Sequence, residues 1–160
     1  MQKKLNLEDF LDRLSGKIII AGIGNSLRGD DAVGSYIVKN LQGRIKAVTL
    51  DCEDSPEKYI DKFIDLKPDL IIFIDAMRLN RQPGELIIIS NKDIANKGTI
   101  THQTNLHLII HYIKLHINPQ IFIIGIQPED TTFGNSISHK VRETANIICE
   151  LFIERLSNDK

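Results

Sequence analysis

Three runs of apolar residues constrain the fold of this chain more than any other feature. They are KIIIAG at 17–22, DLIIFID at 69–75 and QIFIIGIQ at 120–127, and each is apolar almost throughout. A strand with one face in water alternates between apolar and polar residues, whereas these runs do not alternate. They therefore predict strands buried on both faces, as in a parallel sheet that is covered by helices on both sides.

Amphipathic segments separate these strands. Apolar residues recur there at the spacing of a helix face, and several segments begin with a residue suited to a helix start. Asn6 and Ser55 are candidate caps, and Pro56 would occupy a first helical position. The predicted helices are 6–16, about 30–41, 55–66, 106–117 and a last helix that ends near Leu156.

A further strand, IKAVTL, is predicted at 45–50, and GELIIIS at 84–90 is predicted as another. The connection from Ala76 to Pro83 is too short for a helical crossover. The strand at 84–90 should therefore run antiparallel to its neighbour, at an edge of the sheet. The segment 91–104 has no clear periodicity, and we expect a loop there.

Strands that alternate with helices predict an α/β fold. We expect a three-layer sandwich: a five-stranded, mostly parallel twisted sheet with one antiparallel edge strand and helices on both faces. A length of 160 residues fits one domain, 1–160. Within it, 1–16 would be an extra N-terminal helix and 157–160 a frayed tail.

Composition excludes several classes of function. The formal net charge is −1, so nothing favours binding to nucleic acid or to an anionic membrane surface. No apolar run approaches the roughly 20 residues of a membrane span. Only two cysteines occur and neither lies in a CxxC pair, which predicts a reducing, cytoplasmic location. No added interface helix is visible, and we expect a monomer.

Polar side chains gather where the predicted strands end. In doubly wound folds, ligands bind beyond the carboxyl ends of the strands, where the strand order reverses. His102 lies in the loop before the helix at 106–117, within plausible reach of these ends. The strand-end candidates are Asn25, Asp30, Asp31, Asp51, Cys52, Asp75, Gln127, Glu129 and Asp130.

The stretch GIGNSLRGDDAVG at 22–34 has two competing interpretations. GIGN after a strand could begin a dinucleotide fingerprint, but Leu27 stands where that motif needs its third glycine, so nucleotide binding is disfavoured. Asp30 and Asp31 could cap the following helix and complement its dipole. Asp75 alone could be a turn residue at a strand end.

The other histidines and the cysteine are weaker candidates. His107 and His111 have the i, i+4 spacing of a metal pair, but HLIIH lacks the glutamate of HExxH, so we expect them on the surface. His116 and His139 are expected on the surface as well. Cys52 has no placed His–Asn pair to activate it as a nucleophile.

Asp31, Asp75 and His102 together would offer two carboxylates and an imidazole. Such a ligand set suits divalent Ni, Zn, Mn or Fe and leaves coordination positions open for a substrate. The donor atoms do not select one metal, because no thiolate is among them. Spacing does not prove the cluster, because the three residues come from distant parts of the chain.

Four ordered motifs resemble those of the hydrogenase maturation endopeptidases, and the resemblance spans about 17–156. It is closest to the branch that processes the large subunit of hydrogenase 3. The motifs are GIGNSLRGDDAVG, FIDAMRLNRQPGEL, THQTNL and GIQP. The family commonly has a Gly-rich turn after the second strand, whereas this chain has DCEDSPE with Cys52 and Glu53.

The resemblance implies an aspartic-type endopeptidase that removes a C-terminal extension from the large-subunit precursor of a nickel–iron hydrogenase. It implies that nickel arrives with the precursor and is not held tightly by the free enzyme. The implied metal-contacting and catalytic residues are Asp31, Asp75 and His102, while Asp30 is expected to cap the helix. Nickel could polarise the scissile carbonyl, or a carboxylate could serve as general base.

Two other classes of function stay open at this stage. A free-standing α/β metallohydrolase would hold its own zinc. A non-catalytic binding module would take a nucleotide or cofactor, or act as a chaperone that binds the precursor without cutting it.

Overall fold

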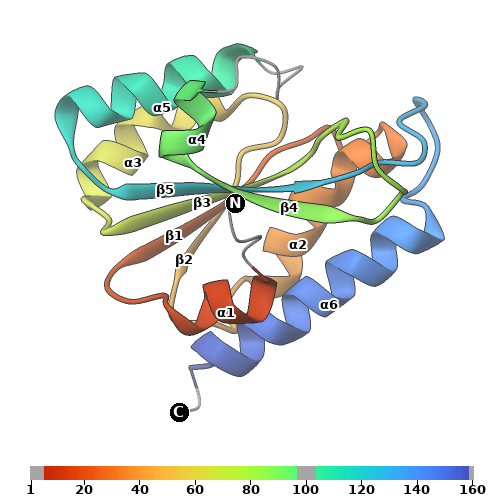
Figure 1. The fold of residues 1–160 in the computed structure, drawn as a ribbon, viewed down its shortest axis with the longest axis horizontal. Coiled ribbons are helices and arrows are strands. Elements are labelled where there is room, and N and C mark those ends of the chain that lie inside the picture. The colour runs from red at the N-terminus through yellow and green to blue at the C-terminus, as the bar shows by residue number, and fades with distance from the viewer. Residues whose placement is uncertain (1–5, 97–103, 159–160) are drawn as a thin grey trace.

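The apolar runs form the centre of one sheet in the computed structural model, which describes residues 6–96 and 104–158. Helices pack on both sides of this sheet (Figure 1). The predicted α/β three-layer sandwich is confirmed. The strands are β1 (Ile18–Gly22), β2 (Val48–Asp51), β3 (Leu70–Ala76), β4 (Leu86–Ser90) and β5 (Gln120–Ile126).

The strand order is β2-β1-β3-β5-β4. β1 pairs in parallel with β2 and β3, and β3 pairs in parallel with β5. β4 is antiparallel to β5, with Leu86 opposite Ile126, and it lies at the edge. The short connection after β3 therefore led to the correct prediction, because it leaves no room for a crossover helix.

Six α-helices and two 3₁₀ helices occur in the described residues. Pro56 begins the second 3₁₀ helix as predicted, but the Ser55 side chain makes no capping hydrogen bond. Asn6 does cap the first helix, accepting from Glu8 N at 3.3 Å. The helices are α1 (Leu7–Asp12), η1 (Gly29–Ala32), α2 (Val33–Leu41), η2 (Pro56–Tyr59), α3 (Ile60–Leu66), α4 (Asn91–Asn96), α5 (Thr104–His116) and α6 (His139–Leu156).

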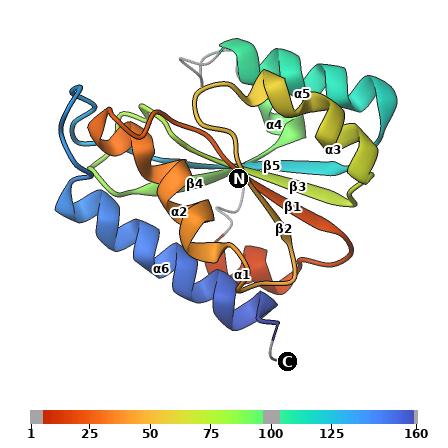
Figure 2. The same ribbon diagram turned by 180° about the vertical axis from the view of Figure 1, so that it is seen from behind.

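Alternate residues of each central strand enter two separate cores. Ile18 and Ile20 of β1 lie in the core under α1, α2 and α6, while Ile19 and Ala21 lie in the core under α3 and α5. Figures 1 and 2 show these two helix layers on opposite sides of the sheet. Because both faces are covered, all five residues of β1 are buried, which accounts for its unbroken apolar run.

The segment 91–104 differs from its prediction. Asn91–Asn96 form α4, and α5 begins at Thr104. Ser90 Oγ accepts from Asp93 N at 3.4 Å and donates to Asp93 Oδ2 at 3.1 Å. A serine followed three residues later by an acid is a helix-start pattern, and it accounts for the short helix.

The two ends of the chain pack together. Phe10 of α1 makes an edge contact with Phe122, with ring centroids 4.9 Å apart, and Arg155 of α6 pairs with Asp12 at 2.8 Å. The fraying expected at 157–160 stays a prediction, and residues 159 and 160 lie outside the described part. Ser157 bridges to Ile45, and the Asn158 side chain donates to Gly43 O at 3.2 Å.

The strand order reverses between β1 and β3. The chain passes from β1 outward to β2 and then returns to β3 on the other side of β1. From β3 it runs to β4 at the far edge and comes back to β5, which lies between β3 and β4. Ile23 N donates to Ile74 O at 2.9 Å, so the carboxyl ends of β1 and β3 remain joined. A crevice for a ligand is expected at this point, and Asp31 and Asp75 follow these two strands.

Candidate functional site

The glycines of the first motif allow backbone segments to approach closely. Gly24 has φ +145°, and a Cβ there would lie 1.7 Å from Asp31 O. A Cβ on Gly22 would lie 2.2 Å from Gly34 O, in the first turn of α2. The motif therefore holds η1 and α2 directly against the end of β1, and places the Asp31 backbone beside that end.

Asn25 fixes the connection between β1 and η1. Its Oδ1 accepts from Leu27 N at 2.9 Å, which closes an Asx-type turn. Its backbone N–H donates to Asp31 Oδ2 at 3.0 Å. That bond holds one carboxylate oxygen of the half-buried Asp31 and so fixes the direction of the group.

Asp75 is the most unusual polar residue in the described structure. It ends the apolar run of β3 and is only 1% exposed, and its Oδ1 has no hydrogen-bond partner among the residues that the structure describes. Burial raises the pKa of Asp75 well above its usual range, and the nearby charge of Asp31 raises that pKa further. A hydrogen bond from the Ala76 backbone acts in the opposite direction.

Asp31 and Asp75 therefore form a pair of interacting carboxylates at the switch point of the sheet. Desolvation and mutual repulsion disfavour two negative charges there. A proton or a cation between the carboxylates would relieve both effects, and Asp75 Oδ1 supplies a free acceptor for either one. His102, the third predicted residue, lies outside the described residues, and the remainder of the chain holds no cluster of three metal-binding side chains.

Asp30 does not have the predicted capping role. The helix begins as the 3₁₀ turn η1, and neither η1 nor α2 has a side-chain cap. The Asp30 side chain is fully buried instead and accepts four hydrogen bonds from the loop between β5 and α6. Oδ2 accepts from Glu129 N (2.8 Å), Asp130 N (3.0 Å) and Ser138 Oγ (2.8 Å), and Oδ1 accepts from Ser138 N (2.6 Å).

Gln127 holds the connection after β3 in place by hydrogen bonds, as Asp30 holds the loop after β5. Its Oε1 accepts from Leu79 N at 2.6 Å, and its Nε2 donates to Pro128 O at 3.0 Å. Gly84 N donates to Gln127 O at 2.9 Å. The GIQP motif therefore fastens the segment that follows Asp75 to the end of β5, which the sequence did not indicate.

The polar residues after β2 are structural. Asp51 accepts from Ser35 Oγ at 2.6 Å and lies 3.6 Å from Lys39 Nζ, which ties β2 to α2. Burial, with the neighbouring Asp51 charge, raises the pKa of the Cys52 thiol to about 12. Cys52 therefore remains a thiol near neutral pH, which agrees with the low rank of this residue as a nucleophile.

The departure from the family pattern after β2 has a conformational explanation. Glu53 has φ +52°, in the left-handed region that favours glycine. Its carbonyl accepts from Gly24 N at 2.7 Å. A glutamate therefore occupies a position that favours glycine, and this turn contacts the first motif through its backbone.

The remaining histidines lie on the surface, as predicted. The side chains of His107, His111 and His116 are exposed on α5, and that of His139 is exposed at the start of α6. No helix among the described residues is both long enough and apolar enough to span a membrane.

The fold and this pair of carboxylates define a doubly wound α/β protein with an acidic ligand site at its switch point. Comparison with known proteins then specifies the family. The family model for hydrogenase maturation proteases of the HycI type matches residues 35–155. The crystal structure of the [NiFe] hydrogenase maturation protease HycI from Thermococcus kodakarensis KOD1 superposes with a TM-score of 0.84 at 34% identity, covering 94% of this chain and 97% of that one.

Two further relatives agree. A Methanocaldococcus jannaschii protein assigned to the hydrogenase maturation proteases is 36% identical over 159 residues, covering 92% of this chain and 94% of the relative. The hydrogenase 3 maturation protease of Escherichia coli (strain K12) is 29% identical over 133 residues, covering 81% of this chain and 85% of the relative. The chain belongs to the hydrogenase maturation protease family, and it is a peptidase.

Proposed function

We propose that this peptidase removes the C-terminal extension of a nickel-loaded hydrogenase large-subunit precursor, and that Asp31, Asp75 and His102 contact the nickel. The observation that carries the proposal is Asp75 Oδ1, which is buried close to the charge of Asp31 and has no hydrogen-bond partner within 6–96 and 104–158. A stable core does not need such a group, because an apolar residue would fit the end of β3 at lower cost.

A divalent cation is the ligand that suits this pair best. It offsets the desolvation of Asp75 and the repulsion from Asp31 together, and it suits a site of two oxygen donors and an imidazole. In this proposal nickel belongs to the substrate, and the enzyme completes its coordination. A precursor without nickel would leave the two carboxylates unneutralised, which accounts for selectivity.

Hydrolysis also requires a water molecule to lose a proton. A carboxylate of the pair can take that proton as general base, in the manner of an aspartic peptidase. Nickel, when present, would act as a Lewis acid toward the scissile carbonyl or the water. Asn25 keeps the Asp31 carboxylate in a fixed direction through its backbone N–H, which limits the reorganisation needed during the reaction.

We further propose that the enzyme acts in the cytoplasm. Cys52 and Cys149 are both free and buried, which fits a reducing compartment. The expectation of a monomer stays a prediction, and sedimentation of the purified protein would test it.

A panel of variants tests the roles of the residues. Asp31→Asn, Asp75→Asn and His102→Ala would each be incubated with the cognate nickel-loaded precursor, and the mass of the large subunit would be measured. We expect each variant to lose at least about 100-fold in rate, the scale for removing an acid–base or electrostatic group. His111→Ala and Cys52→Ala serve as matched controls and should cleave normally. Full activity in Asp31→Asn or Asp75→Asn would contradict the proposal.

A further inference from the structure

Two large apolar side chains are exposed on loops that meet beside the candidate site. Leu27, between β1 and η1, is 58% exposed, and Phe133, between β5 and α6, is 64% exposed. The loops are joined by a hydrogen bond from Gly134 N to Leu27 O at 2.7 Å. We call Leu27 and Phe133 the apolar ledge.

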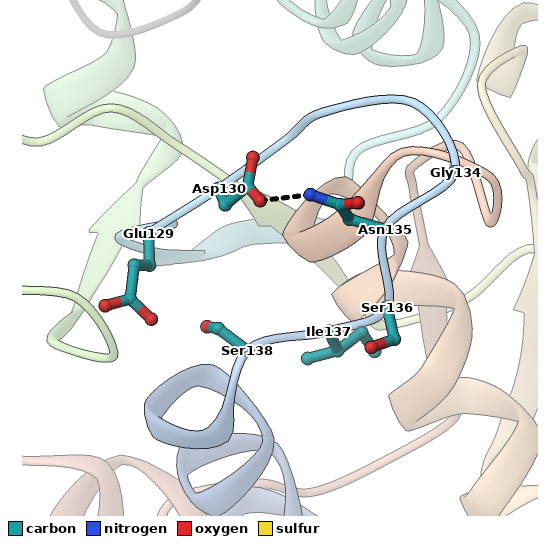
Figure 3. A pocket seen from close by; sticks show the side chains of 7 residues that line it. All are labelled: Glu129, Asp130, Gly134, Asn135, Ser136, Ile137 and Ser138. Atoms are coloured by element: carbon teal, nitrogen blue, oxygen red, sulfur yellow. Dashed lines mark hydrogen bonds between the residues drawn. The ribbon is translucent and has the colours of Figure 1, made fainter.

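Hydrogen bonds hold the two loops that carry the ledge in place. Gly29 N donates to Asn135 O at 3.0 Å and Asp30 N to Asp130 O at 2.8 Å, and the buried Asp30 carboxylate adds its four bonds to the same loop. Asp130 also accepts from Asn135 Nδ2 at 2.6 Å, across the loop (Figure 3). Exposed apolar groups on so firmly tied a loop indicate a preorganised contact surface.

Two hydrogen bonds link the Leu27 end of the ledge to Asp31. Asn25 Oδ1 accepts from Leu27 N, and Asn25 N donates to Asp31 Oδ2. One residue therefore connects the first half of the ledge to the site. Beside the second half lies a hollow of about 640 Å³, lined by loop residues between Glu129 and Ser138 (Figure 3).

We propose that the apolar ledge binds an apolar side chain of the precursor, in the segment next to the scissile bond. The inference rests on the proposed function, because it takes the precursor as the occupant of the neighbouring site. Leu27 and Phe133 would favour precursors that have an apolar side chain at this position, because the contact removes apolar surface from water. They take no part in proton transfer or in contact with the nickel.

The test measures cleavage and binding separately. Leu27→Ala and Phe133→Ala would be compared with Ile147→Ala and Leu115→Ala, whose side chains are 54% and 68% exposed on α6 and α5. KM and kcat would be determined with the cognate nickel-loaded precursor, and affinity would be determined by titration with the same precursor. An alanine scan of the precursor around the scissile bond would locate the partner side chain.

We expect each ledge variant to raise KM and weaken binding by about 10- to 100-fold, the equivalent of one buried Leu or Phe side chain. We expect kcat and melting temperature to change little, and both control variants to match wild type. The Phe133→Ala effect should also disappear when one particular apolar residue of the precursor is alanine.

The outcomes are distinguishable. If wild type cleaves and the ledge variants cleave with unchanged KM, the ledge inference is wrong and the proposed function stands. If wild type binds without cleaving and the ledge variants bind weakly, the ledge stands and the proposed function fails. If wild type neither binds nor cleaves, or if the variants only convert a dimer to a monomer, the precursor is not the occupant.

Discussion

Asp30 and Asp31 are adjacent, yet the structure gives them opposite roles, and a pair of isosteric substitutions separates these roles. Asp30 is fully buried and accepts four hydrogen bonds from the loop between β5 and α6. Asp31 is half-buried and accepts one hydrogen bond, from Asn25 N. Asp30→Asn should therefore destabilise the fold, while Asp31→Asn should leave it intact and abolish cleavage.

The magnitude for Asp30→Asn follows from the bonding pattern. Oδ2 accepts three hydrogen bonds and Oδ1 accepts one, from Ser138 N. An amide keeps one acceptor oxygen, so its NH₂ group must face the Ser138 N–H or the three other donors. The loss of one charge-assisted bond costs about 1.5–3 kcal/mol, and the remaining bonds weaken once the charge is gone. We expect a total loss of about 2–4 kcal/mol in the free energy of unfolding.

For Asp31→Asn the expected loss is less than about 1 kcal/mol, because the amide oxygen can still accept from Asn25 N. Urea unfolding followed by far-ultraviolet circular dichroism measures both variants, since the chain contains no tryptophan. With a slope of about 2 kcal/mol/M, the Asp30→Asn midpoint should fall by about 1–2 M. Equal midpoints for the two variants, or a larger fall for Asp31→Asn, would refute the assignment.

Three further predictions concern the same end of the sheet. The pKa of Asp75 is raised in the folded state. The protonated side chain therefore stabilises the fold fully below the unfolded pKa, near 4, and this stabilisation is lost as pH rises toward the folded pKa, at up to about 1.4 kcal/mol per pH unit. Urea unfolding at pH 4.5 and pH 7 should show a smaller decline in the free energy of unfolding for Asp75→Asn than for wild type. Cys52, with a pKa of about 12, should resist iodoacetamide at pH 8 in the native protein and react in urea, and mass spectrometry would detect any native labelling that contradicts this. Gly24→Ala should unfold the site or prevent folding, because its Cβ would lie 1.7 Å from Asp31 O; a normal melting temperature would show that the Gly24 geometry is wrong.

The sheet was predictable because its signals are local. Runs without alternation indicate strands that are buried on both faces, and the short connection after Asp75 dictates an antiparallel neighbour. Asn25 was also predictable, since an Asx-type turn involves residues two positions apart. The helix at Asn91–Asn96 could have been found in the same way, from Ser90 and Asp93.

The functions of Asp30 and Gln127 could not be predicted in this way. The loop partners of the Asp30 carboxylate are 99 to 108 residues away in the sequence, and those of Gln127 Oε1 are 46 to 48 residues away. An aspartate at a helix start is locally compatible with capping, so only the three-dimensional contacts separate the two roles. The pairing of Asp31 with Asp75 is also non-local, and its prediction depended on the family motifs and on the position of both residues after strands.

The most direct test of the central claim compares one substrate in two states. The cognate large-subunit precursor would be prepared with and without nickel and incubated with the wild-type enzyme. The mass of the large subunit would then be measured by mass spectrometry. We predict that only the nickel-loaded precursor loses its C-terminal extension, because the cation is what neutralises Asp31 and Asp75. Equal cleavage of both forms would contradict the claim, and would leave the two carboxylates as an acid–base pair that does not detect nickel.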